Sequence, residues 1–143
     1  MIALDTNVLV HAHRKDSPWH EDAFRVVGDL AEDRLSWAIP WPCLHEFLAV
    51  ATHPRVWDPP TPLEDACAQI EFWRESPSLV LLGETGGYLG VLNAALTAGK
   101  VQGARVHDAH IAALCIHHGV EELLTLDRDF ERFPALCTRN PLM

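Results

Sequence analysis

The sequence predicts an α/β sandwich, in which helices cover both faces of a mostly parallel sheet. Short apolar runs alternate along the chain with longer segments whose apolar residues recur at helical spacing. This alternation of strand and helix favours a parallel sheet between helical layers. The length of 143 residues matches one domain of common size. We therefore expect residues 1–143 to form a single folding unit.

Five short segments have the composition of strands, and six longer segments have that of helices. The expected strands are residues 2–4, 35–39, 79–82, 123–126 and 135–139. The expected helices are residues 8–13, 18–32, 42–52, 62–73, 88–98 and 106–117. We find no internal repeat and no low-complexity tract, so no linker divides the chain.

Prolines set several of the expected boundaries. Ser17 and Thr61 each precede a proline, so each is predicted to cap a helix that has proline at its first position. Glu64 can complete a capping box with Thr61. The segment of residues 53–60 contains three prolines, which cannot continue a helix, so we expect a loop between two helices there.

Composition and charge narrow the classes of function. No window approaches the roughly 18 consecutive apolar residues of a membrane span. The chain begins with strand-like sequence and its four cysteines are scattered, so we expect reduced thiols and a cytoplasmic protein. The net charge of −9 argues against a basic surface that grips nucleic acid. A nucleic-acid substrate stays open, because a metal ion held by acids is itself a local positive charge.

Four carboxylates lie where the chain passes from one expected element to the next. Asp5 and Asp127 follow expected strands, whereas Glu46 and Asp108 lie in the first turns of expected helices. The carboxyl ends of parallel strands meet at one edge of a sheet, so these side chains can converge there. Such a cluster points to a bound divalent metal, and so to an enzyme that acts on phosphate esters.

Each acid also has an ordinary structural explanation. Asp5, Thr6 and Asn7 are all residues that cap helices, so they can simply begin the next helix. Glu46 borders an apolar helix face, although a solvated glutamate is the usual case. For Asp129, we favour capping of one helical turn over catalysis.

Asp108 is the acid that a structural role explains least well. It shares a helix face with Ile111, Ala112 and Cys115 at positions i, i+3, i+4 and i+7, which is the face a helix normally buries. The helix N-terminus offers a carboxylate only about 0.3–1 kcal/mol, whereas its desolvation costs several kcal/mol. A nearby cation or strong donors are therefore expected, with an ordinary N-cap as the alternative.

Repulsion between the ionised carboxylates favours the binding of cations to the cluster. Two like charges about 4 Å apart repel by roughly 4 kcal/mol at an effective dielectric constant of 20. One or two Mg²⁺ ions would relieve this repulsion, because magnesium prefers oxygen ligands. A bound ion would also lower the pKa of a water molecule and offset charge on a phosphate in the transition state.

The same residues, taken in order, resemble the PIN-domain ribonucleases, specifically the VapC-type toxins of bacterial and archaeal toxin–antitoxin pairs. The motifs are Asp5-Thr6-Asn7, Glu46, Asp108 and Thr125-Leu126-Asp127-Arg128-Asp129-Phe130. The resemblance spans nearly the whole chain and implies a PIN-like α/β/α sandwich with a central, mostly parallel sheet of about four to five strands. Leu126 stands where family members often have a small residue. This departure does not change the assignment of any of the acids.

This resemblance implies an endoribonuclease that depends on Mg²⁺ or Mn²⁺ and acts as a toxin. Its catalytic, metal-binding acids would be Asp5, Glu46, Asp108 and Asp127. Its supporting positions would be Thr6, Asn7, Thr125 and Asp129, the last being an acid that only some members use. Family members commonly form homodimers and are silenced by a small antitoxin that places a basic side chain in the acidic cleft.

Several side chains are candidates for contacting RNA or a partner. The candidates for RNA contact are Arg14, Arg105, His107 and Arg128, with surface solvation as the alternative for each. The tryptophans Trp37, Trp41 and Trp57 can fill the core or lie at a partner surface.

Other classes of function fit the sequence less well. A zinc site at His107 and His110 would lack a third ligand, and a haloacid-dehalogenase-like phosphatase would need an aspartate where Asn7 stands. Two alternatives stay open: a housekeeping PIN nuclease, and a catalytically silent domain that binds an antitoxin or another protein.

Overall fold

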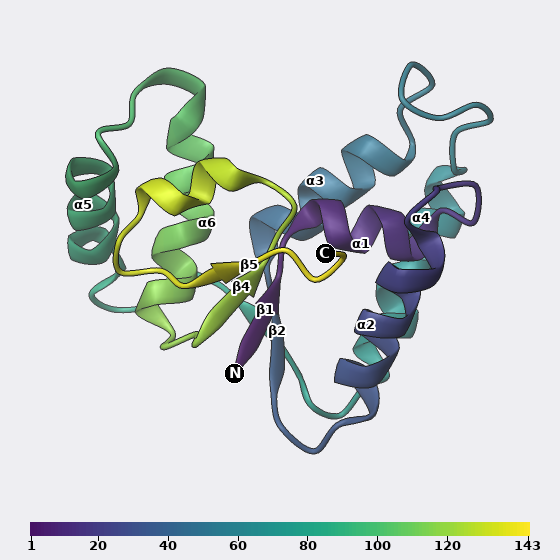
Figure 1. The fold of residues 1–143 in the computed structure, drawn as a ribbon, viewed down its shortest axis with the longest axis horizontal. Helices are drawn as coiled ribbons and strands as arrows, with labels where there is room; N and C mark the ends of the chain where they lie inside the picture. Colours follow the sequence, from purple (N-terminus) through teal and green to yellow (C-terminus); the bar gives the residue numbers. More distant parts are fainter.

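The computed structural model describes residues 1–143 and places five strands in one sheet between layers of helices (Figure 1). The strands are β1 (Ile2–Leu4), β2 (Trp37–Pro40), β3 (Leu79–Leu82), β4 (Glu122–Leu124) and β5 (Thr138–Arg139). Their order in the sheet is β3-β2-β1-β4-β5, and every pair is parallel. The predicted α/β/α sandwich with a parallel sheet is confirmed.

Six α-helices connect and cover the strands. They are α1 (Thr6–His13), α2 (His20–Glu32), α3 (Trp41–Ala51), α4 (Leu63–Arg74), α5 (Tyr88–Gly99) and α6 (Val106–His117), with short 3₁₀ turns η1 (Gly103–Arg105) and η2 (Arg128–Arg132). Helices α5 and α6 lie on one side of the sheet, and α1, α2 and α4 lie on the other (Figure 1). None of the helices combines the length and apolarity needed to cross a lipid bilayer.

The sheet order explains why sites far apart in the sequence come together. Strands β1 and β4 are direct neighbours, with Leu4 paired to Leu124, so the residues that follow them leave the sheet side by side. The backbone N–H of Asp5 donates to the carbonyl of Leu124 at 3.0 Å. The turn after β1 is therefore fixed to the turn after β4.

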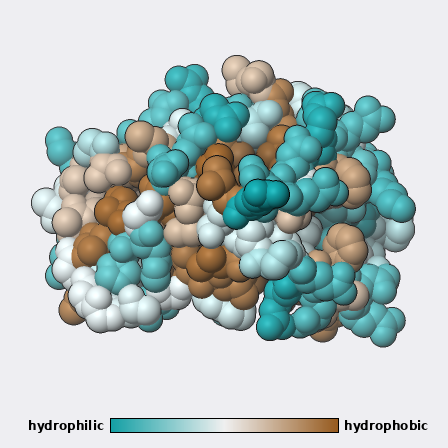
Figure 2. All heavy atoms as spheres, turned by 90° about the horizontal axis from the view of Figure 1, so that it is seen from below, coloured by the Kyte–Doolittle hydropathy of each residue, from teal (hydrophilic) through white to brown (hydrophobic).

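Buried apolar side chains from both layers form one continuous core of 28 residues. Its largest members include Trp37, Phe47, Phe130 and Phe133, none of which is more than about 2% exposed. Gly99 allows α5 to approach the Phe133 ring, because a Cβ atom there would lie 2.6 Å from that ring. Figure 2 shows the end of the molecule that lies opposite the carboxyl ends of the strands. This surface carries both hydrophilic residues and apolar patches.

The predicted helix caps at Ser17 and Thr61 are wrong. Helix α2 begins at His20 rather than Pro18, and Ser17 Oγ accepts the N–H of Trp19 in the turn before it. Helix α4 has Pro62 at its N-cap without a side-chain cap. Thr61 Oγ1 instead accepts from Arg14 Nη1 at 3.1 Å, so there is no capping box with Glu64. At Thr61, an arginine 47 residues away donates to the hydroxyl that the local sequence predicted to cap the helix.

Three strand boundaries also differ from the prediction. Strand β2 begins at Trp37, because Leu35 lies in the preceding turn and is 75% exposed. Strand β4 covers Glu122–Leu124, so Thr125 and Leu126 lie beyond it. The last strand is only Thr138–Arg139. The predicted loop of residues 53–60 is confirmed and joins α3 to α4.

Candidate metal centre

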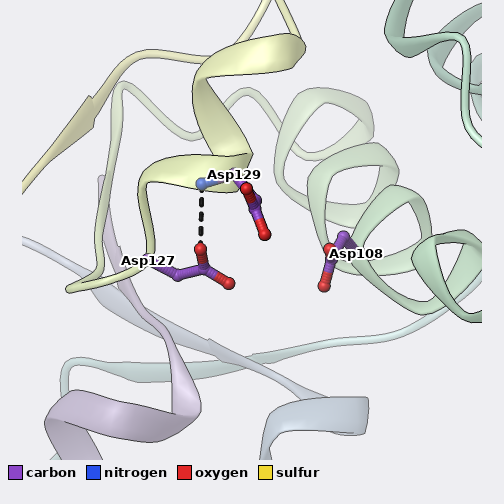
Figure 3. Close-up of side chains that lie close together, drawn as sticks. All are labelled: Asp108, Asp127 and Asp129. Atoms are coloured by element: carbon purple, nitrogen blue, oxygen red, sulfur yellow. Dashed lines mark hydrogen bonds between the residues drawn. The ribbon is translucent and has the colours of Figure 1, made fainter.

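Three aspartates converge beside the carboxyl end of β4 (Figure 3). Asp108 comes from the first turn of α6, Asp127 follows β4, and Asp129 lies in η2. One carboxylate oxygen from each lies within 4.8 Å of the others. Burial and the neighbouring charge of Asp127 raise the pKa of Asp108 above its ordinary value. Three oxygen ligands of like charge at this separation suit a hard divalent cation.

Asp127 shapes this cluster by capping the short helix that carries Asp129. Asp127 Oδ1 accepts the backbone N–H of Asp129 at 2.8 Å (Figure 3). The predicted capping role of Asp129 is therefore wrong, because the cap belongs to the residue two positions earlier. The Asp129 carboxylate is left to face the cluster.

A fourth acid, Asp5, is buried at the end of β1 and is only 5% exposed. It is the N-cap of α1, and its Oδ1 accepts the backbone N–H of Thr6 at 2.7 Å. Its Oδ2 accepts from Thr125 Oγ1 at 2.7 Å and from Asn7 Nδ2 at 3.3 Å. Burial outweighs these hydrogen bonds and raises the pKa of Asp5 to about 6. Asp5 is thus both the ordinary helix cap and part of the acidic site.

Thr125 and Asn7 connect Asp5 to the segment that carries Asp127. Thr125 Oγ1 donates to Asp5 and accepts the backbone N–H of Asp127 at 3.0 Å. Asn7 Oδ1 accepts the backbone N–H of Leu126 at 3.2 Å. These bonds fix the positions of Asp5 and Asp127 relative to each other, as side chains around a metal-binding group commonly do.

Glu46 reaches the same site from α3. Its side chain is exposed on one side, while Thr6 Oγ1 donates to its Oε2 at 3.1 Å. Asp5, Glu46, Asp108 and Asp127 together line one cleft of about 270 Å³. The structure therefore brings the four sequence-predicted acids to a single cleft, and Asp129, predicted as a supporting position, joins Asp108 and Asp127 in the cluster of three.

Arg105, one of the predicted RNA contacts, lies against the acids. Its guanidinium forms an ion pair with Asp129, and its Nη1 lies 3.8 Å from Asp108 Oδ2. This cation holds the pKa of Asp129 below its ordinary value. Arg105 therefore neutralises one side of the cluster, and sequence spacing gave no sign of this pairing across 24 residues.

The other predicted RNA contacts occupy different environments. His107 is exposed in the first turn of α6, and the side chain of Arg128, the first residue of η2, is 89% exposed. Arg14 is buried, and it bonds to Asp16 and Thr61 rather than facing the cleft. Arg14 is therefore buried outside the cleft lining, whereas His107 and Arg128 present exposed side chains.

One part of the cleft lining is absent from the site residues predicted from the sequence. It contains Val10 and His11 of α1, Val50 of α3, and Val56 and Trp57 of the following loop. The sequence predicts Trp57 only as a core residue or as part of a partner surface. The signal that could have found it is its place in a proline-rich loop directly after the helix that carries Glu46.

Comparison with known families identifies a PIN domain over residues 2–136. The ribonuclease VapC48 of Mycobacterium tuberculosis is 36% identical over 138 residues, which cover 96% of this chain and 94% of that protein. The ribonuclease VapC37 of the same species is 34% identical, with 99% of this chain and 97% of that protein covered.

Solved structures with the same fold include VapBC2 of Rickettsia felis bound to a DNA fragment from the promoter. Its matched chain superposes with a TM-score of 0.69 at 20% identity and with 97% of this chain and 98% of that chain covered. The sarcin-ricin loop cleaving toxin VapC20 of Mycobacterium tuberculosis gives 0.65 at 17% identity, with coverage of 92% and 93%. This chain therefore belongs to the PIN-domain family and, within it, to the VapC group.

Proposed function

We propose that this protein is the toxin of a toxin–antitoxin pair and that it hydrolyses RNA phosphodiester bonds with the help of Mg²⁺ or Mn²⁺. The observation that carries the proposal is the convergence of Asp108, Asp127 and Asp129 within 4.8 Å, in a site that Asp5 and Glu46 complete. The relatives named ribonuclease VapC support RNA as the substrate. Residues 1–143 act as one unit in this proposal, in the cytoplasm.

The donor set fits a hard divalent cation. Every candidate ligand is a carboxylate oxygen, which is what Mg²⁺ and Mn²⁺ prefer. Without a cation, burial favours protonation, so the pKa of Asp5 and that of Asp108 are both raised. A divalent ion would hold both groups in their ionised form. Asp108 and Asp127 would hold it most directly, with Asp5, Glu46 and Asp129 around them.

The chain's own residues would position the reacting groups. A bound divalent ion supplies positive charge for the phosphate and lowers the pKa of a water molecule. Thr125 and Asn7 hold Asp5 in place, while Glu46 uses Oε2 to accept from Thr6. Glu46 Oε1 accepts no hydrogen bond within the protein and is therefore free to orient a water molecule at the cleft.

An antitoxin partner follows from the same proposal. Several solved relatives are toxin–antitoxin complexes, including one from Salmonella typhimurium bound to DNA. The acidic cleft of this chain suits a basic side chain from such a partner. A second surface, the groove of about 690 Å³ between α2 and α4, exposes Phe24 and Phe72, as an apolar docking site would. We also propose that the protein forms a homodimer, as members of this family commonly do.

The test of nuclease function is cleavage of purified RNA by purified protein. We expect cleavage with added Mg²⁺ or Mn²⁺, loss of cleavage with EDTA, and no cleavage by the Asp108→Asn variant at any concentration of metal. Asp29→Asn is the matched control, because Asp29 is exposed on α2 outside the cleft. Cleavage that survives both EDTA and Asp108→Asn would overturn the proposal in favour of a contaminating nuclease or a silent binding domain.

A further inference from the structure

We propose that Trp57 stacks against an RNA base in the cleft, beside the phosphate that the aspartates receive, and that Arg14 is the residue that positions Trp57. This inference rests on the proposed nuclease function and adds a contact for the base to it. It gives the loop between α3 and α4 a role in choosing the substrate.

The first observation is the place of Trp57 in the cleft. Trp57 lines the same cavity of about 270 Å³ as Asp5, Asp108 and Asp127, although it comes from a loop on the far side of α3. Its neighbour Val56 is exposed and lines the cavity as well. Because Trp57 and the aspartates line one cavity of this size, a nucleotide whose phosphate meets the aspartates has its base within the same cavity as the Trp57 ring.

The second observation is how Arg14 holds the indole ring. The Arg14 guanidinium carbon lies 4.7 Å from the Trp57 ring centroid. The guanidinium is itself fixed, because Nε and Nη2 donate to Asp16 at 2.9 and 2.7 Å and Nη1 donates to Thr61 at 3.1 Å. Trp57 lines the cleft and Arg14 does not, so the guanidinium contacts the ring without being part of the cavity wall.

A comparison with Trp37 separates this role from core filling. Trp37 is fully buried in β2, and its Nε1 donates to Ser76 Oγ at 3.0 Å. Trp57 is only partly buried, and its Nε1 is a buried donor with no acceptor in the protein. An unpaired buried N–H is unfavourable. The ring therefore keeps this position through its stacking on Arg14, which is the arrangement of a preformed platform.

The chemistry of such a platform defines what it recognises. Every base has a π-face, so stacking on an aromatic side chain tolerates different sequences. It does require a base that is free of its own stack and pair, as bases in RNA loops and single strands are. Trp57 would therefore select an unpaired nucleotide beside the scissile bond, and other contacts would set the preference among bases.

The test is binding of a labelled single-stranded oligoribonucleotide to the Asp108→Asn protein with Mg²⁺, measured by fluorescence anisotropy. Adding Trp57→Leu should weaken binding by about 5- to 150-fold, the range for loss of one stacked base. Trp57→Phe keeps an aromatic face and should retain most of the affinity. Trp19→Leu is the control, because Trp19 is exposed at the start of α2 and lies outside the cleft. Equal affinity for the Leu and parent proteins would overturn the stacking role.

A second arm tests the positioning role of Arg14. Arg14→Lys keeps the charge but loses the planar group and its paired donors. We expect this change to weaken binding in the parent protein and to add nothing in the Trp57→Leu protein, with thermal melting confirming that each variant is folded. Full additivity of the two effects would overturn the positioning role, because it would show that Arg14 acts independently of Trp57.

The outcomes also separate this inference from the nuclease proposal. If the wild-type protein cuts RNA with Mg²⁺ while Trp57→Leu binds and cuts equally well, the stacking role is wrong and the nuclease stands. A second outcome is that no RNA is cut, but replacing one nucleotide of the RNA by an abasic one weakens its binding to the protein that retains Trp57 and not to the Trp57→Leu protein. In that case the nuclease proposal fails while the stacking role is supported.

Discussion

The two sides of the acidic site are built in opposite ways. Asp5 is buried, and donors from Thr6, Asn7 and Thr125 surround its carboxylate. Asp108 and Asp129 are partly exposed, and Arg105 is the cation beside them. The Asp5 carboxylate is thus held by hydrogen bonds that the fold supplies, whereas Asp108 and Asp129 are balanced by the charge of one partly exposed arginine.

This difference separates what the fold provides from what a ligand must provide. The bonds around Asp5 connect the ends of β1 and β4 and contribute to the folded state whether or not a cation is present. The three aspartates beside Arg105 repel one another, and this one arginine offsets only part of their charge, so a bound divalent cation should add to the stability of this side. We expect substitutions on the two sides to differ in whether they affect stability or activity.

The largest effect is expected at Asp127, on the repulsive side. Asp127→Asn keeps a side-chain oxygen that can cap η2 but removes one charge from the cluster. We expect RNA cleavage to fall by at least about 100-fold, as for other groups that act on charge in the transition state. The thermal midpoint without metal should stay equal or rise, because one repulsion is gone. A fall in both activity and melting temperature would show that Asp127 is mainly structural.

The pH dependence of stability tests the buried side. The pKa of Asp5 is about 6 in the folded protein against 3.8 for the free side chain, so the folded state takes up the proton first. Stability should therefore rise as the pH falls through about 6 and level off below about 3.8, by about 3 kcal/mol in total. Urea unfolding in EDTA at several pH values would measure this change.

Subtracting the curve of the Asp5→Asn protein isolates this contribution. The subtraction is needed because His11 is partly buried with a lowered pKa, so acid opposes the effect of Asp5 by forcing charge on that ring. Saturating Mg²⁺ should flatten the Asp5 contribution, since a cation favours the ionised carboxylate. If the free energy of unfolding changed with pH in the same way in the wild-type protein and the Asp5→Asn protein, burial would not raise the pKa of Asp5.

Removing the hydroxyl of Thr125 should loosen the connection between the two sides. Thr125→Val leaves the buried Asp5 without its shortest side-chain donor and the Asp127 N–H without its acceptor. We expect a loss of about 1–3 kcal/mol in the free energy of unfolding, the usual result of leaving a buried partner unpaired. Thr138→Val, in the edge strand β5, is the matched control. Equal losses of unfolding free energy in the two variants would show that the Thr125–Asp5 hydrogen bond contributes no more than an edge-strand threonine does.

Sequence periodicity could place the acids that regular elements carry. Asp5 and Asp127 follow strands that parallel pairing makes neighbours, and Asp108 lies on the same helix face as the buried Ile111 and Ala112. These relations repeat within each element, so local pattern and a parallel sheet are enough to predict them.

Several of the parts that were wrong or missed depend on single pairs of residues far apart in the chain. Thr61 was expected to cap α4, but Arg14 takes its hydroxyl. Asp129 was expected to cap a helical turn, but Asp127 is the cap and the Asp129 carboxylate pairs with Arg105, 24 residues earlier. Trp57 lines the cleft and lies against Arg14, a residue 43 positions earlier at the end of α1. No local periodicity encodes such contacts, so a single sequence does not reveal them.

The smallest effect is expected at Arg105, where the protein's own cation competes with a metal ion. Arg105→Gln should tighten Mn²⁺ binding by a few-fold, because the ion would no longer displace an ion pair from Asp129. The gain should shrink at high salt, since the pair is exposed and already screened there. Calorimetric titration of Mn²⁺ into both proteins measures it, with Arg25→Gln on α2 as the control pair. Weaker binding in the Arg105 variant would instead mean that the arginine holds Asp129 in its ligand position.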